Sequence, residues 1–238
     1  MEANEAKCLF AVESGSRAWG FESANSDYDV RFVYWMPKDW YLSIENKRDV
    51  IEEIGDDDLD FAGWDLRKAL KLAHKSNPSL HDWLATPDCY DTDDRFFTEF
   101  KELSREYFDP HSGYQHFRSM ATTNFRDFVD ADKLPFKKYF YVFRALLCSR
   151  YIADHRKPAP CLFQVLLDAY YPDGNVREEI EKLLEAKRKG IETADTSRNP
   201  TLHREVGRLL SDTSNEPPKR PLMPTEKLDE FFRKVIES

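Results

Sequence analysis

The sequence has no uninterrupted apolar run of about 18 residues, and its first seven residues are charged and lack the apolar core of a signal peptide. A membrane span needs the first feature and a secretory signal needs the second, so neither is predicted. Cysteine is also scarce. The four cysteines are scattered without a CxxC pair, which argues against a disulfide framework or a zinc knot and favours a reducing compartment. The sequence therefore predicts a cytoplasmic protein with no membrane partner.

Basic residues are few in the first quarter of the chain. Residues 1–65 hold 6 Lys and Arg against 16 Asp and Glu, a net charge of −10, whereas the rest carries +1. This balance argues against a protein that coats nucleic acid without sequence preference, which needs a basic face, but it leaves a local basic groove open. The acidity has two interpretations. It is either a solvated surface or a set of carboxylates that converge on cations, because neighbouring carboxylates repel unless a cation compensates them.

The order of the expected elements predicts an α+β fold, because apolar and alternating strand patterns come first and helical patterns come after them. The expected strands are 7–13, 26–35, 50–54 and 58–61. Helical spacing begins at residue 63 and stops at Asn77–Pro78, and further helices are expected at 80–85, 94–107, 112–131, 135–154, 161–170, 176–189 and 226–236. We therefore expect a small mixed sheet unit at 1–88, a helical domain at 89–213, and a Pro-rich linker with a terminal helix at 214–238.

Two aspartates lie two positions apart in the second expected strand. Side chains alternate along a strand, so Asp27 and Asp29 share one side, while Tyr28 and Val30 point the other way, toward a core. Paired carboxylates fit a site that binds magnesium, which takes oxygen ligands and keeps waters for a substrate phosphate. Two such ions, roughly 3.5–4 Å apart, can activate an attacking oxygen and stabilise a leaving pyrophosphate. The alternative is an acidic turn on an edge strand.

A third carboxylate usually completes such a site. Asp60 is the best-placed candidate, on the neighbouring expected strand, and Asp65 at the start of the next helix is the alternative. Gly15 and Ser16 come directly after the first strand. Glycine lets the backbone approach a phosphate closely, and the serine hydroxyl can bind the same phosphate.

Two basic residues are candidate nucleotide ligands. Arg31 lies on the same side of its strand as Asp27 and Asp29, so it either reaches a phosphate or pairs with an aspartate. Lys68, on the helix after the third carboxylate, is a candidate cation for a triphosphate. The alternative for Lys68 is a solvated helix face that it shares with neighbouring basic residues.

These residues resemble a known signature. The stretch from Gly15–Ser16 to Asp27–Tyr28–Asp29 resembles the GS…DxD signature of the polymerase-β-type nucleotidyltransferase superfamily. Residues 63–70 and 75–84 are similar to the predicted nucleotidyltransferases of RNA-repair operons, the RNA-ligase-associated polymerase-β-like family. The resemblance covers roughly residues 8–170.

The resemblance implies a nucleotidyltransferase core at residues 1–88, succeeded by helices. It implies transfer of a nucleoside monophosphate from a nucleoside triphosphate (NTP) to an acceptor hydroxyl, with two Mg²⁺ ions or with Mn²⁺. Asp27 and Asp29 match the metal-binding aspartates, and Gly15–Ser16 matches the triphosphate turn. The family's setting implies RNA, such as a tRNA end, as acceptor and an RNA ligase as partner. Two alternatives stay open: transfer of AMP to a protein hydroxyl, and a nucleotide-binding regulatory protein without turnover.

Overall fold

The computed structural model describes residues 5–54, 59–126, 133–135, 137–189 and 195–237. The chain forms two compact units. The sheet unit contains residues 1–18, 27–108 and 220–238, and the helical unit contains residues 19–26 and 109–219. The sheet unit therefore continues past residue 88, to residue 108, and also includes the end of the chain. The helical unit includes the short segment 19–26, which precedes Asp27.

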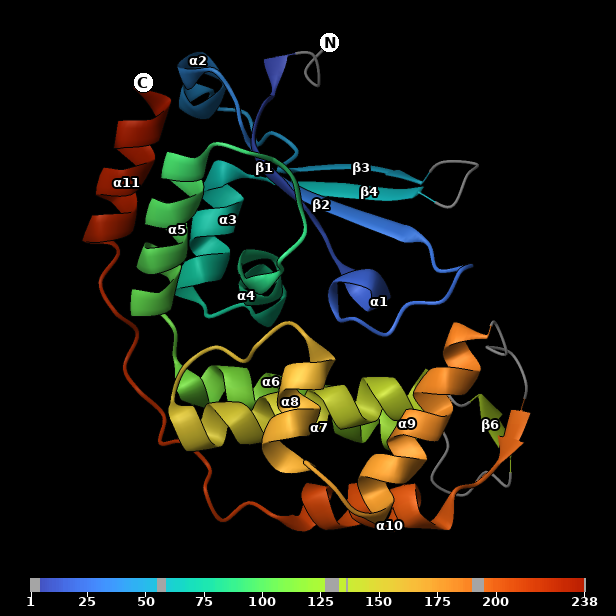
Figure 1. The fold of residues 1–238 in the computed structure, drawn as a ribbon. Helices are drawn as coiled ribbons and strands as arrows, with labels where there is room; N and C mark the ends of the chain where they lie inside the picture. Colours follow the sequence, from blue (N-terminus) through green and yellow to red (C-terminus); the bar gives the residue numbers. More distant parts are fainter. Residues whose placement is uncertain (1–4, 55–58, 127–132, 136, 190–194, 238) are drawn as a thin grey trace. The chain divides into compact units, whose positions relative to one another are not determined.

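The sheet unit contains a five-stranded mixed sheet in the order β3-β4-β2-β1-β5, and strands β1 to β4 can be followed in Figure 1. The strands are β1 (Lys7–Glu13), β2 (Tyr28–Trp35), β3 (Val50–Ile54), β4 (Leu59–Asp65) and β5 (Cys89–Thr92). Strands β2 and β4 are parallel, and the other neighbours are antiparallel. The predicted α+β class is thus confirmed. The sequence predicts only helices after Asn77–Pro78, and β5 shows that this is wrong. This strand is short and mostly exposed, so it carries no apolar pattern.

Helices α3 (Leu66–His74), α4 (Pro78–Ala85), α5 (Asp94–Glu106) and α11 (Glu226–Ile236) pack together in the sheet unit (Figure 1). Side-chain caps start three of them: Asp65 accepts from the Arg67 amide, Asn77 from Leu80 and Asp93 from Phe96. Their apolar faces form the main core with β1 and β2. The short helices α1 (Gly15–Ala18) and α2 (Lys38–Leu42) come after β1 and β2.

His81 on α4 is buried in this core. Its ring packs edge-on against Phe108, and its Nε2 has no hydrogen-bond partner among the described residues. Burial, with a smaller contribution from Arg105, lowers the pKa of His81 from its ordinary value of 6.5 to about 4. Only the unfolded chain takes up the proton between these two values, so the fold loses stability as the pH falls from 6.5 toward 4.

We therefore expect the free energy of unfolding to decline by about 1 kcal/mol per pH unit in this window because of His81. His81→Phe keeps the ring packing and removes the titration. Urea unfolding of both proteins from pH 7 to pH 4 measures the difference, and equal slopes would contradict the assignment.

The helical unit is built from α6 (Pro110–Arg126), α7 (Lys137–His155), α8 (Phe163–Tyr170), α9 (Asn175–Arg188) and α10 (Pro200–Ser211), with a short β6–β7 pair (Lys133–Pro135 and Asp195–Ser197). Helix α10 is not among the predicted helices. The segment Trp19–Ser26 belongs to this unit because Phe21 is buried against Phe140 and Phe163, with ring centroids 5.4 and 5.6 Å away. Among the described residues, no helix is long and apolar enough to cross a membrane.

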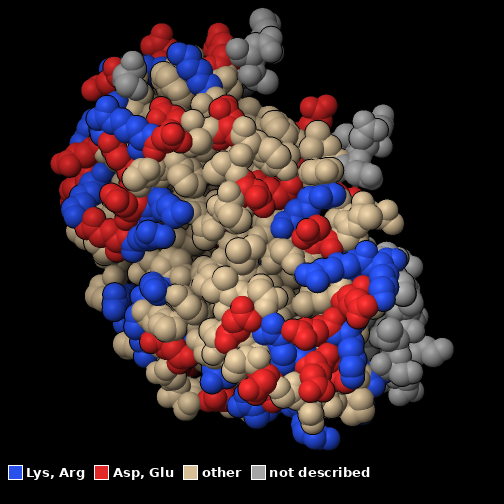
Figure 2. All heavy atoms as spheres, viewed as in Figure 1, with Lys and Arg blue, Asp and Glu red and all other residues tan. Residues whose placement is uncertain are grey.

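The two units differ in charge. The sheet unit has 17 Lys and Arg against 27 Asp and Glu, a net charge of −10, and the helical unit has 18 against 17, a net charge of +1. On the face shown in Figure 2, basic and acidic side chains are interspersed. The acidity of the chain therefore lies in the unit that holds the predicted site.

Candidate active site

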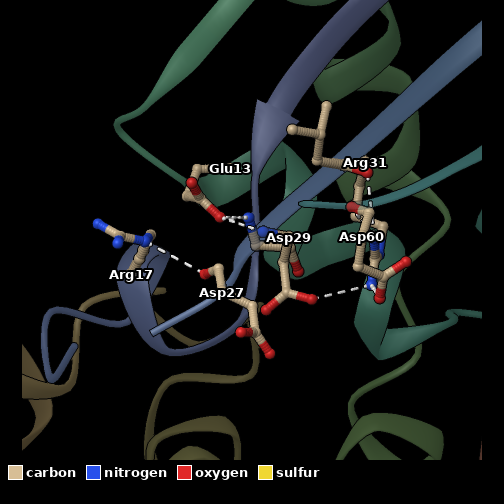
Figure 3. Close-up of polar contacts among 8 residues, drawn as sticks. Glu13, Arg17, Asp27, Asp29, Arg31 and Asp60 are labelled. Atoms are coloured by element: carbon tan, nitrogen blue, oxygen red, sulfur yellow. Dashed lines mark hydrogen bonds and ion pairs between the residues drawn. The ribbon is translucent and has the colours of Figure 1, made fainter. Parts of the chain in front are cut away.

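Two of the predicted carboxylates lie side by side at one end of the sheet. Asp29 on β2 and Asp60 on β4 are register partners in the parallel pair. Asp27 immediately precedes β2, and its side chain extends toward the same side as that of Asp29 (Figure 3). The Asp29 side chain is 29% exposed and that of Asp60 is 43% exposed, so both reach solvent. The alternation along β2 and its parallel register with β4 thus bring three carboxylates to one end of the sheet.

Arg31 lies between two of these carboxylates. Its Nη2 donates to Asp29 Oδ1 at 3.1 Å and to Asp60 Oδ2 at 2.7 Å (Figure 3). Its Nη1 donates to the backbone oxygens of Val30 and Asp60 at 3.1 and 3.0 Å. The sequence left two roles open for Arg31, a contact with a phosphate or a pairing with an aspartate. In the structure Arg31 pairs with two aspartates.

The electrostatics of Asp29 reflect this crowding. Burial raises the pKa of Asp29, and Arg31 opposes the rise, whereas Asp60, Glu13 and Asp27 add to it. The net result is a raised pKa, which means that the negative charge at Asp29 is only partly compensated by Arg31.

Glu13 is a fourth carboxylate, and it lies outside the motifs that the sequence pointed to. It is buried at the end of β1, where its Oε1 accepts from the amides of Ser14 and Asp29 at 3.1 and 3.0 Å. Its Oε2 accepts from the Tyr90 hydroxyl. A glutamate at the end of an apolar strand, just before Gly15, is the signal that could have identified it, because a buried charge needs partners. Glu13 fixes the backbone of Asp29.

Gly15 lies directly against Asp29. It has a positive φ of 62°, and a Cβ built on it would lie 2.0 Å from Asp29 Oδ2. The amide of Ser14 donates to the backbone oxygen of Asp29 at 2.9 Å. The predicted Gly15–Ser16 turn is therefore adjacent to the aspartates, and only glycine allows the carboxylate to approach this closely.

Gly15→Ala is expected to destabilise the protein by about 2 kcal/mol and to displace the Asp29 carboxylate, because a left-handed alanine and a steric collision add together. Gly174→Ala is the matched control, since Gly174 has a φ of 89° with no described atom within 4 Å of its built Cβ. Both variants should lose stability in urea unfolding, but only Gly15→Ala should weaken Mn²⁺ binding. Equal Mn²⁺ affinity in Gly15→Ala and the unsubstituted protein would contradict the displacement of Asp29.

Tyr28 and Arg17 form a pair beside the carboxylates. Tyr28 is 47% exposed, which corrects the expectation that it points into a core. The Arg17 guanidinium lies 3.8 Å from the Tyr28 ring centroid, and its Nε donates to the Asp27 backbone oxygen at 3.2 Å. Because β2 begins at Tyr28, this ring lies at the end of the sheet, beyond the apolar clusters that cover the rest of the strand. Arg17 is thus a basic residue that adjoins the predicted site.

Asp65 and Lys68 lie elsewhere. Asp65 ends β4, five residues or about 16 Å of extended strand from Asp60. Its buried carboxylate accepts from the Tyr41 hydroxyl at 2.5 Å and caps α3. Lys68 lies in the first turn of α3, and its Nζ pairs with Asp49 Oδ1 at 2.9 Å. The structure therefore brings neither residue to the cluster of Asp27, Asp29 and Asp60.

The donor set fits a hard divalent cation. Carboxylate oxygens are the ligands that Mg²⁺ and Mn²⁺ prefer, and because Gly15 has no side chain, Asp29 Oδ2 can lie where a Cβ would otherwise be. Within the described part of the chain, no three Asp, Glu, His or Cys side chains converge closely enough to enclose an ion. At the cluster, Arg31 Nη2 lies within hydrogen-bond distance of both Asp29 and Asp60.

Comparisons with known proteins identify the family of the chain. The family model described as RNA repair pathway DNA polymerase beta family matches residues 1–234. The uncharacterized protein YcgL of Bacillus subtilis (strain 168) is 42% identical over 208 residues, which cover 86% of this chain and 80% of that protein. A nucleotidyltransferase-like protein from Exiguobacterium sibiricum 255-15, known from a crystal structure, matches with 12% identity and a TM-score of 0.28, over 87% of this chain and 66% of that chain. The family match spans both units, and so the chain belongs to the RNA repair pathway DNA polymerase beta family.

Proposed function

We propose that the protein is a magnesium-dependent nucleotidyltransferase that transfers a nucleoside monophosphate from an NTP to a hydroxyl of an RNA acceptor. The observation that carries the proposal is the pairing of Asp29 with Asp60 in register on β2 and β4, with Asp27 on the same side. Membership of the family supports the reaction type, and the family's description supports RNA as the acceptor.

In this reaction the acceptor oxygen forms a bond to the α-phosphorus, the bond to pyrophosphate breaks, and the acceptor hydroxyl loses its proton. Asp27 and Asp29 would hold two Mg²⁺ ions, or Mn²⁺ in their place, and Asp60 would be the third metal-binding carboxylate. When bound, these ions supply positive charge that offsets the charge of the triphosphate and of the leaving pyrophosphate. Asp60 would also orient the acceptor hydroxyl and draw off its proton.

The triphosphate would bind at the turn that contacts Asp29. Gly15 allows the backbone to approach the phosphates, and the half-buried Ser16 is the next residue in the same turn. Arg31 is the third proposed ligand, because its guanidinium already lies at the carboxylates that would meet the phosphates. Lys68 has no part in this proposal, since its ion pair with Asp49 lies at the far end of β4.

Nucleotide labelling tests the proposal. The purified protein is incubated with Mg²⁺, tRNA and each α-labelled NTP in turn, and separately with a cell-protein extract. We expect label on RNA, and we expect the double variant Asp27→Ala/Asp29→Ala to reduce it at least about 100-fold. Asp39→Ala, an exposed carboxylate on α2 beyond the other end of β2, is the matched control and should retain activity.

Three other outcomes would contradict the proposed transfer to RNA by these aspartates. Label on a protein band that disappears in the double variant would assign transfer of AMP or another nucleotide to a protein hydroxyl. Nucleotide binding without incorporation into either acceptor would assign a regulatory role. Label on RNA that persists in Asp27→Ala/Asp29→Ala would remove these aspartates from the reaction.

A further inference from the structure

The Arg31 side chain is largely buried and is held by hydrogen bonds, rather than extended into solvent. Its side chain is 18% exposed, and each of its two terminal nitrogens donates two hydrogen bonds. Two of the four acceptors are backbone oxygens, which keep their positions whatever the charge of the site. The guanidinium is thus oriented by the strands themselves, with Nη2 directed at both carboxylates (Figure 3).

The atoms that Arg31 contacts are the atoms that an ion would need. A cation bridging β2 and β4 would bind a carboxylate oxygen of Asp29 and one of Asp60. Arg31 Nη2 already lies 3.1 and 2.7 Å from Oδ1 of Asp29 and Oδ2 of Asp60. The second oxygen of Asp29 faces Gly15. A divalent ion and a guanidinium cannot both approach the same oxygens without strong repulsion between their charges.

We propose that Arg31 is the resident counter-ion of the site, and that a divalent ion binds by displacing its guanidinium from Asp29 and Asp60. This proposal rests on the proposed function, because the ion is the one that the transfer reaction uses. Arg31 weakens the binding of an ion to the nucleotide-free protein. It becomes a phosphate ligand once an anionic triphosphate arrives with the ion, because the phosphate oxygens then replace the carboxylates as its acceptors.

The exchange couples the two ligands. The ion alone must compete with a fixed positive charge, whereas the ion with a triphosphate brings new acceptors for that charge. By linkage, the same coupling raises the affinity for the triphosphate when the ion is present. Arg31 therefore disfavours metal binding until a nucleotide is bound.

The test measures binding of Mn²⁺ alone, without nucleotide, by the electron paramagnetic resonance signal of the free ion. Arg31→Gln removes the charge, so we expect Mn²⁺ to bind at least about tenfold more tightly than to the unsubstituted protein. Thermal unfolding gives an independent readout: the variant should be less stable without metal and should gain more stability from Mn²⁺. Arg48→Gln is the matched control, since Arg48 forms an exposed ion pair with Glu52, and its Mn²⁺ affinity should not change.

Arg31→Lys provides a second variant should Arg31→Gln fail to fold. It keeps the positive charge but cannot form four hydrogen bonds, and its Mn²⁺ affinity should exceed that of the unsubstituted protein by a smaller factor. Equal or weaker Mn²⁺ binding in both variants would overturn the exchange while leaving the metal site intact. Absence of Mn²⁺ binding in every protein, with and without nucleotide, would overturn the proposed function as well.

Discussion

Asp60→Ala is expected to reduce nucleotidyl transfer about a thousandfold, whereas Asp65→Ala is expected to reduce the free energy of unfolding by about 3 kcal/mol instead. The Asp60 side chain is solvent-accessible and pairs with Arg31 in the cluster, so its loss should cost little stability. The buried Asp65 carboxylate accepts from the Tyr41 hydroxyl and from two amides at the start of α3. Its removal deletes a helix cap and leaves a buried hydroxyl without its acceptor.

Urea unfolding and RNA labelling on the same two variants separate these roles. Tyr41→Phe combined with Asp65→Ala completes a double-mutant cycle, and the second substitution should cost less once the hydroxyl is gone. If Asp65→Ala abolished transfer at unchanged stability, Asp65 rather than Asp60 would be the third carboxylate. Full transfer by Asp60→Ala would exclude Asp60 from the reaction.

The side-by-side arrangement of the carboxylates could be predicted to a large extent from local rules. Alternation along a strand is a property of the backbone, so the shared side of Asp27, Asp29 and Arg31 can be deduced from their spacing. The register of Asp29 with Asp60 cannot be deduced from spacing, because it depends on which strands become neighbours and how they align. The sequence favoured Asp60 over Asp65 only because Asp60 lies on the neighbouring expected strand.

The placement of Lys68 could not be predicted, because the strand before it is longer than its sequence indicates. Gly63 falls within β4, although glycine usually weakens a strand. The reason is a long-range contact: the Phe32 ring covers Gly63 so closely that a Cβ built there would lie 2.3 Å from it. The strand therefore runs on to Asp65, and Lys68 lies in the first turn of α3, at the opposite end of β4 from the cluster.

The end of the chain could not be placed either, because a Pro-rich segment gives no sign of where the chain goes after it. Residues 220–238 return to the sheet unit. The Tyr107 hydroxyl donates to the Pro224 backbone oxygen at 2.7 Å, and a His74 ring nitrogen lies 2.6 Å from the Met223 backbone oxygen. These contacts join residues more than 100 positions apart, and no periodicity in either segment predicts them. These contacts position the terminal helix α11 against the core of the sheet unit, which carries the candidate site.

Truncation after Thr225, which removes α11, is expected to unfold the sheet unit. Leu228 is buried in the main core, Phe231 packs against Phe96 and Phe100, and Phe232 packs edge-on against Tyr41. Deleting such side chains costs about 2 kcal/mol or more each, so the loss is at least about 6 kcal/mol. That is comparable with the whole stability of an ordinary domain. Near-ultraviolet circular dichroism should lose the aromatic signal of the sheet unit.

Two leucines in the full-length chain test the same packing without removing the helix. Leu228 is 4% exposed and Leu222, in the segment before α11, is 72% exposed. Leu228→Ala should lower the free energy of unfolding by about 3 kcal/mol, whereas Leu222→Ala should change it by less than about 0.5 kcal/mol. Equal stability of the two variants, or a truncated protein that keeps its melting temperature, would show that α11 does not support the sheet. If only Leu228→Ala and the truncation lose stability, the candidate site depends on α11, the last helix of the chain. The reason is that β2 and β4 pack on the core that this helix completes.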